Sequence, residues 1–260
     1  MKNPESLKQI VKDNYAAIAV NPQKSCCGTK EPDFTAFSLD YTKKDGYVKD
    51  ADLKLGCGIP TEYAGIKPGN VLLDLGSGAG NDCFVARSIV GESGAVTGLD
   101  FTDEMLEKAR KNNLKMGFGN VKFVRGDIEN MPLPENSFDV VISNCVMNLV
   151  PDKVRGFAEI RRVLKPGGHF CISDIVLEGK LPDIMRNTAS LYAGCVSGAI
   201  QKNAYMQIIS DTGFKKVEIK AKKNNNLSDE ILLTHVSQEV VDDYRESGSG
   251  IFSITVVGYK

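Results

Sequence analysis

The sequence lacks both a long apolar run and a strong net charge. No stretch of the 260 residues approaches the roughly 18 continuous apolar residues of a membrane-spanning helix. Lysine and arginine number 32 against 33 aspartates and glutamates, so the chain has no basic field for nucleic acid or an anionic membrane. The first twenty residues also lack the apolar core of a secretory signal. We therefore expect a cytoplasmic protein that acts on small molecules, with neither a membrane nor a nucleic-acid partner.

Histidine is scarce, and cysteine pairs of the C-x2-C type are absent. His169 opens an apolar run and His235 lies in an expected helix, and neither belongs to a motif with a partner. No general base is therefore assigned. Pairs of the type C-x2-C do not occur, which argues against a structural zinc site. The seven cysteines are an odd and scattered set, typical of reduced thiols rather than of a disulfide framework.

Five short apolar runs organise the middle of the chain. They are 71–76, 95–100, 121–127, 138–144 and 169–176. Most of them are separated by helical stretches, and they do not alternate with polar residues. This pattern is typical of a parallel sheet covered on both faces, and it predicts a doubly wound α/β fold.

Further elements flank this predicted core. An amphipathic helix begins near Pro4, and an irregular segment of the kind that forms lids follows from residue 21 to 46. The lysine-rich stretch 220–226 is expected to be a solvated loop. Beyond residue 176 we expect helices at 181–192, 201–212 and 228–246, and strands at 215–221 and 251–260.

The stretch "DLGSGAGND", residues 74–82, follows the first expected strand and precedes a helix. Gly76, Gly78 and Gly80 permit a tight turn and the close approach of a nucleotide-like ligand to the backbone. Two alternatives stay open for this turn: it binds a dinucleotide, or it is a glycine-rich turn that binds no ligand. Asp74 lies two residues before the first glycine, where it favours a cationic ligand and repels a pyrophosphate. Asp100 ends the second strand, where a carboxylate can accept hydrogen bonds from ribose hydroxyls.

The cysteines fall into two groups. Cys83 and Cys171 lie in an expected helix and an apolar strand, and we interpret both as structural. The others lie at a strand end or in irregular segments. Cys145 follows Asn144, the last residue of the expected strand, in "VISNCVMNLV". Cys57 lies in "LGCGIP", Cys195 in "YAGCVSGA", and Cys26 and Cys27 in "SCCGTK". Open α/β sheets bind ligands at the carboxyl ends of their strands. Three converging thiolates there match a soft, three-coordinate acceptor such as trivalent arsenic.

Four motifs resemble those of the class I S-adenosylmethionine methyltransferases: "LDLGSGAG", "GLD", "GDIENMPLPENSFDVV" and "RVLKPGG". The resemblance implies a mostly parallel, seven-stranded Rossmann-like sheet with an N-terminal helical cap and C-terminal substrate-binding insertions. It also implies S-adenosylmethionine as the cofactor. The implied cofactor-binding residues are Asp74, Gly76, Ser77, Gly78 and Gly80 for the methionine moiety, Asp100 for the ribose, Asp127 and Ile128 for the adenine, and Asn144.

Further motifs resemble one branch, the arsenite methyltransferases: "GCG" at 56–58, "DLGSGAGNDC" at 74–83, "SNCVMNLVPDK" at 143–153 and "GCVSGA" at 194–199. The resemblance implies that Cys57, Cys145 and Cys195 bind the metalloid substrate. It implies that Cys26 or Cys27 takes part in a disulfide relay, which thioredoxin or glutathione resets. The chain departs from the family in having Lys54 and Leu55 where relatives often carry aromatic residues.

These inferences divide the chain into three parts: an N-terminal helix with a mobile cysteine-containing cap at 1–56, an S-adenosylmethionine-binding core at 57–180, and C-terminal substrate-binding elements at 181–260. The expected activity is methyl transfer to trivalent arsenic, in arsenic detoxification. Two alternatives stay open. One is methyl transfer to another small molecule, of the quinone or sterol type, and the other is capture of arsenite without catalysis.

Overall fold

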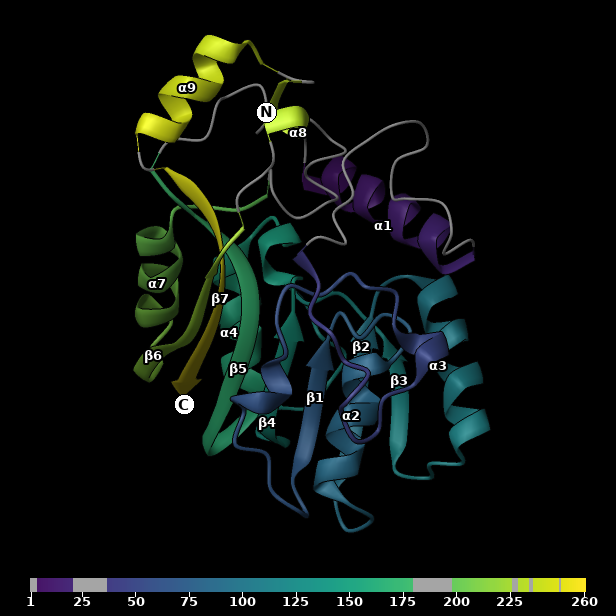
Figure 1. Ribbon diagram of the computed structural model, residues 1–260. Coiled ribbons are helices and arrows are strands. Elements are labelled where there is room, and N and C mark those ends of the chain that lie inside the picture. The colour runs from purple at the N-terminus through teal and green to yellow at the C-terminus, as the bar shows by residue number, and fades with distance from the viewer. Residues whose placement is uncertain (1–3, 21–36, 180–197, 226–228, 234–235, 248) are drawn as a thin grey trace.

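A seven-stranded sheet forms the centre of the protein (Figure 1). The computed structural model describes residues 4–20, 37–179, 198–225, 229–233, 236–247 and 249–260. The strands are β1 (Val71–Leu75), β2 (Ala95–Asp100), β3 (Val121–Arg125), β4 (Phe138–Asn144), β5 (Leu164–Glu178), β6 (Lys215–Asn224) and β7 (Gly250–Tyr259). Their order is β3-β2-β1-β4-β5-β7-β6. The first five run parallel, and β7 pairs antiparallel with both β5 and β6.

Helices lie on both faces of this sheet and above the carboxyl ends of its parallel strands (Figure 1). They are α1 (Pro4–Val20), α2 (Asn81–Val90), α3 (Asp103–Met116), α4 (Lys153–Val163), α7 (Lys202–Asp211), α8 (Asp229–Leu233) and α9 (Gln238–Glu246), with short 3-10 turns η2 (Lys49–Ala51), η3 (Pro60–Glu62) and η4 (Met147–Leu149). Residues of α2 and α3 pack in one apolar cluster, and residues of α4 and α7 in another. Neighbouring residues of one strand, such as Leu72 and Leu73, belong to these opposite clusters. The continuous apolar runs in the sequence follow from burial on both faces.

The predicted doubly wound α/β sheet is confirmed, and two local predictions are wrong. The helix predicted at 228–246 is two helices, α8 and α9. The first part of the predicted solvated loop, up to Asn224, continues strand β6. Every residue of β6 is at least partly exposed, and this explains why its lysines suggested a loop. The predicted helix at 181–192 lies outside the described residues.

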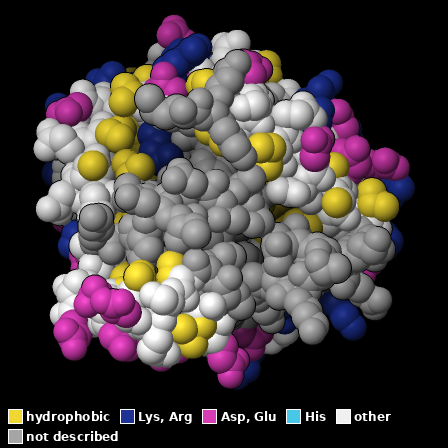
Figure 2. Space-filling view, turned by 90° about the horizontal axis from the view of Figure 1, so that it is seen from above, with side chains coloured by type: hydrophobic (Ala, Val, Ile, Leu, Met, Phe, Trp, Pro, Cys, Tyr) yellow, Lys and Arg dark blue, Asp and Glu magenta, His cyan; other side chains and the backbone are white. Residues whose placement is uncertain are grey.

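The carboxyl ends of the parallel strands lie beneath α1 (Figure 1). Helix α1, at the N-terminal end of the described chain, packs against α3. Strand β7, at the C-terminal end, lies between β5 and β6 in the sheet. Seen from above, acidic, basic and hydrophobic side chains are interspersed on the described part of this face (Figure 2). None of the described helices combines the length and the apolar composition that crossing a membrane requires.

Candidate functional site

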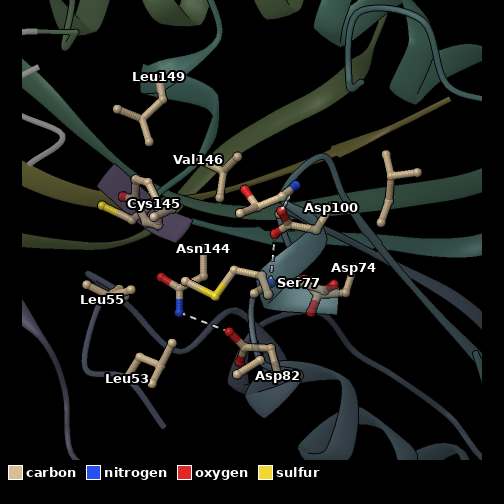
Figure 3. A pocket seen from close by; sticks show the side chains of 18 of the residues that line it. Leu53, Leu55, Asp74, Ser77, Asp82, Asp100, Asn144, Cys145, Val146 and Leu149 are labelled. Carbon is tan, nitrogen blue, oxygen red and sulfur yellow. Dashed lines mark hydrogen bonds between the residues drawn. The ribbon is translucent and has the colours of Figure 1, made fainter. Parts of the chain in front are cut away.

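An open cavity of about 1240 Å³ lies at the carboxyl ends of the parallel strands (Figure 3). Its walls come from α1, the segment 38–56, the turn between β1 and α2, the end of β2, and the residues after β3 and β4. Most of the predicted cofactor-binding residues line it: Asp74, Gly76, Ser77, Gly78, Asp100, Asp127, Ile128 and Asn144. Gly80 does not line the cavity, because it sits at the N-cap of α2 with its α-carbon against Phe84 and Phe123.

The turn after β1 presents bare backbone to the cavity. Gly76 has φ +66°, and a β-carbon there would lie 2.4 Å from Val146 Cγ2. Gly78 has φ +51°, and a β-carbon there would meet only Met105 Sδ, at 3.9 Å. Left-handed backbone favours glycine at both positions. Gly76 therefore permits the turn to pack on the residues after β4, while Gly78 leaves room for a ligand.

Three carboxyl groups line this cavity and are buried: Asp74, Asp82 and Asp100. Burial raises the pKa of Asp82 to about 6, although hydrogen bonds from Tyr41 and Asn144 oppose the shift. Burial and the charge of Asp82 raise the pKa of Asp74 well above its ordinary value. Burial also raises the pKa of Asp100, although its carboxylate accepts the N–H groups of Gly78 (2.9 Å) and Thr102 (2.8 Å). Such a group of acids favours a cationic ligand and disfavours a pyrophosphate.

The cavity also contains unsatisfied polar atoms. Ser77 Oγ and Asn81 Oδ1 are buried and have no hydrogen-bond partner within the described part of the chain. Buried polar atoms are ordinarily paired, so both are available to a polar ligand. Together with the acids and the glycine turn, they fit S-adenosylmethionine, which carries an ammonium group, a sulfonium sulfur and ribose hydroxyls.

An ion-pair cluster joins α1 to the residues after β3 at the rim of the cavity. Lys8 Nζ lies 2.6 Å from Asp127 Oδ2 and 2.5 Å from Glu129 Oε2. Partial burial lowers the pKa of Lys8, but its hydrogen bonds to the two carboxylates prevail and raise it. Asp127, which was predicted to bind the adenine, therefore also forms an ion pair with helix α1.

Cys145 lies where the strand position predicts, immediately after β4. Cys145 lines one side of the cavity, while Asp74 and Asp100 lie on the other side (Figure 3). Its φ of +61° is in the left-handed region, which is uncommon for residues other than glycine. Its N–H donates to Ser173 O of β5 at 2.7 Å, so the turn is fixed to the sheet.

Cys57 and Cys145 belong to the same apolar cluster, and both are buried, at 1% and 4% exposed. Cys57 does not itself line the cavity, although its neighbour Gly56 does. Ala199, four residues after Cys195 in the sequence, packs in this cluster as well. Cys26, Cys27 and Cys195 lie outside the described residues. Over the described ranges, no three metal-ligating side chains come together to hold a metal ion.

The two cysteines predicted to be structural are both buried, but they differ in their surroundings. Cys171 Sγ donates to Pro60 O at 3.2 Å, and burial raises its pKa to about 12. Cys83 Sγ donates to Asp74 Oδ2 at 3.2 Å, so it contacts an acid of the cavity. His169 Nε2 lies 2.5 Å from Ala64 O, so its ring fixes a loop to the sheet.

Sequence reasoning missed three residues that shape the cavity: Lys8, Tyr41 and Asp82. Asp82 lies within the quoted "DLGSGAGND" motif, and its position in the first turn of a helix was the signal that could have identified it. Tyr41 Oη donates to Asp82 Oδ1 at 2.7 Å. Lys8 and Tyr41 come from the N-terminal segment, and no local motif predicts where that segment packs.

Comparisons with known proteins add to this geometry. Residues 66–213 match a family described as a methyltransferase domain. An arsenite methyltransferase of Halobacterium salinarum is 38% identical over 278 aligned residues, which cover all of this chain and 68% of that protein. The crystal structure of an arsenic(III) S-adenosylmethionine methyltransferase from Chlamydomonas reinhardtii matches with a TM-score of 0.67 at 32% identity, over 95% of this chain and 73% of that one. A ubiquinone/menaquinone biosynthesis C-methyltransferase of Shewanella piezotolerans is 39% identical over 135 residues, 51% of this chain and 52% of that protein.

Proposed function

The chain belongs to the family of S-adenosylmethionine-dependent arsenite methyltransferases, and we propose that it methylates trivalent arsenic held by the thiolates of Cys57, Cys145 and Cys195. The observation that carries the proposal is the position of Cys145. Cys145 lines the cavity that fits the cofactor, and its backbone is in the left-handed conformation that favours glycine. A residue that needs only to turn the chain there would be glycine.

Cys57 and Cys195 complete the proposed arsenic site. Cys57 packs in the same apolar cluster as Cys145, and Ala199 of the "GCVSGA" motif joins them. Three thiols that replace the three hydroxyl groups of arsenite release three water molecules, and the arsenic keeps its lone pair. Since this lone pair is the nucleophile, no side chain has to remove a proton for methyl transfer.

The proposed cofactor-binding residues act by orientation. When bound, S-adenosylmethionine supplies an electrophilic methyl group on a positively charged sulfur. Asp74 and Asp82 stabilise that positive charge and the ammonium group, and Asp100 accepts hydrogen bonds from the ribose hydroxyls. Asp127 and Ile128 lie at the adenine end. The apolar side chains of Leu149 and Val146 keep water from the thiol side of the cavity.

Methylation oxidises arsenic(III) to arsenic(V), and two electrons must return. We propose that two site thiolates leave as a disulfide, which restores arsenic(III) with its new methyl group. Cys26 or Cys27 then exchanges with this disulfide, and thioredoxin or glutathione reduces the chain again. Such a relay requires a reducing compartment such as the cytoplasm. In this proposal residues 1–56 form the cap, 57–180 the cofactor core and 181–260 the substrate-binding elements.

The proposal is tested with arsenite, S-adenosylmethionine and a thiol reductant, with methylarsenicals separated by chromatography. We expect product from the wild-type chain and a loss of about 100-fold or more in Cys57→Ser, Cys145→Ser and Cys195→Ser. Cys171→Ser is the matched control and should keep its activity, because its thiol packs in a different apolar cluster. Full activity of Cys145→Ser would contradict the site. Stoichiometric arsenic binding without methylated product would instead indicate a capture protein.

A further inference from the structure

The side chain of Asn144 connects the two described cysteines of the proposed arsenic site. Asn144 is the last residue of β4, and Cys145 follows it directly. Asn144 Oδ1 accepts the backbone N–H groups of Cys57 (3.0 Å) and Gly58 (3.2 Å). One side chain therefore holds the loop around Cys57 against the strand end that carries Cys145.

The nitrogen of the same amide also has hydrogen-bond acceptors for both of its N–H groups. Nδ2 lies 2.9 Å from Tyr41 Oη, 2.9 Å from Gly58 O and 3.1 Å from Asp82 Oδ2. An asparagine side chain has two N–H donors and two acceptor lone pairs. These contacts occupy all of them, so the amide has no donor or acceptor left for a cofactor. Asn144 itself lines the cavity, and its amide donates to Asp82, which lines it as well (Figure 3).

The glycines on both sides of Cys57 fit this arrangement closely. A β-carbon on Gly56 would lie 2.5 Å from Asn144 Nδ2, and one on Gly58 would lie 2.3 Å from Ser173 Oγ. Contacts this short require a neighbour to move. Glycine at both positions therefore lets the loop lie flat against the ends of β4 and β5.

The sheet fixes Asn144 in turn. Asn144 pairs with Ser173 in the parallel ladder of β4 and β5, and Ser173 O accepts the N–H of Cys145. The position of Cys145 is thus set by the same strand pair that holds Asn144. Cys57 belongs to an irregular segment, and its position depends on the side-chain amide.

We infer that Asn144 is a positioning residue that fixes the Cys57 loop beside the strand end that carries Cys145. The inference rests on the proposed function only in so far as the two thiols bind arsenic. It differs from the cofactor contact that resemblance predicts for Asn144. Loss of a cofactor ligand weakens S-adenosylmethionine binding, whereas loss of this positioning residue weakens arsenite binding.

The first test compares Asn144→Ala with Asn120→Ala. Asn120 is the matched control because its amide also ties loops together, at Arg87, Gly91 and Gly94, away from the cavity. We expect Asn144→Ala to speed alkylation of Cys57 by iodoacetamide, mapped by peptide mass spectrometry, and to weaken arsenite binding about tenfold or more. S-adenosylmethionine affinity should change by less than about threefold. Asn120→Ala should leave all three quantities unchanged.

The second test is Asn144→Asp, which keeps the acceptor for the Cys57 loop and loses the donor to Asp82. The new carboxylate faces Asp82 and the Tyr41 hydroxyl, with Asp74 behind them. Two adjacent buried carboxyl groups share one proton, and the introduced carboxyl, when protonated, restores a donor to Asp82. We expect arsenite binding by Asn144→Asp, relative to wild type, to recover as the pH falls from about 8 to about 5.5. Asn144→Ala should show no recovery.

The outcomes separate the two proposals. Slow Cys57 alkylation in Asn144→Ala, with weakened cofactor binding, would overturn the inference and make Asn144 a cofactor ligand. Fast Cys57 alkylation in Asn144→Ala, in a protein whose wild-type form binds no arsenite, would support the positioning role and refute the proposed substrate. The alkylation measurement requires neither arsenic nor activity.

Discussion

At the scale of single residues, the acids of the cavity decide how pH acts on the protein. Asp82 has an ordinary pKa near 3.8, which burial raises to about 6. The empty folded protein therefore holds its proton more tightly than the unfolded chain does. As pH rises from about 4 to 6, the unfolded chain loses this proton first, so the free energy of unfolding of the empty protein falls.

Cofactor binding should show the opposite pH dependence. A cationic ligand favours the charged carboxylate, so binding below pH 6 must displace a proton from the Asp74–Asp82 pair. We expect S-adenosylmethionine affinity to rise about five- to tenfold between about pH 5 and pH 7, with proton release in calorimetry. Asp82→Asn should flatten this profile. A profile that stays steep in Asp82→Asn would show that another group titrates.

The contacts of Asp82 show what a sequence motif does not reveal. "DLGSGAGND" predicted a turn that approaches a cationic ligand, and the positive φ of Gly76 and Gly78 agrees with it. The motif did not reveal that Asp82 bonds to Tyr41 and Asn144, because those partners are 41 and 62 residues away along the chain. Local spacing carries no information about such distant contacts.

At the scale of elements, α1 is a cover held over the cofactor cavity. Three of its residues line the cavity: Lys8, Val11 and Tyr15. Lys8 joins it to Asp127 and Glu129, and Lys12 lies 3.5 Å from Asp103 of α3. Partly exposed ion pairs contribute little each, so we expect the cover to open without unfolding of the core.

Lys8→Met tests this role of α1. The variant keeps the apolar stem and loses both ion pairs, so we expect faster hydrogen exchange in residues 4–20 and cofactor dissociation faster by about three- to tenfold. The control is Lys111→Met, which removes an exposed pair with Glu107 within α3. It should leave both rates unchanged. Unaltered exchange in α1 after Lys8→Met would contradict the cover.

Element prediction succeeded where burial imposes a pattern and failed where it does not. The apolar runs 71–76 and 138–144 became β1 and β4, because strands buried on both faces leave a continuous signal. Strand β6 is exposed along its length, so its lysines predicted a loop beyond residue 221. The single helix predicted at 228–246 failed because periodicity does not register a break of a few residues.

At the scale of the whole molecule, strands from both halves of the chain form one sheet. β7 inserts between β5 and β6, so the C-terminal segment completes the cofactor core. We therefore expect one thermal unfolding transition, raised by about 5 °C when S-adenosylmethionine is present at about 100 times its dissociation constant. Calorimetry and circular dichroism should give the same midpoint. Two transitions, of which only one responds to the cofactor, would indicate a separate C-terminal unit.

In the proposed function, thiols from separate loops hold arsenic beside the cofactor cavity. X-ray absorption at the arsenic edge, on protein with one equivalent of arsenite, measures the neighbours of that atom directly. We predict three sulfur neighbours and no oxygen in the wild-type chain and in Cys171→Ser, and two sulfurs in Cys145→Ser. Arsenic that keeps oxygen neighbours in the wild-type chain, or three sulfurs in Cys145→Ser, would contradict the account.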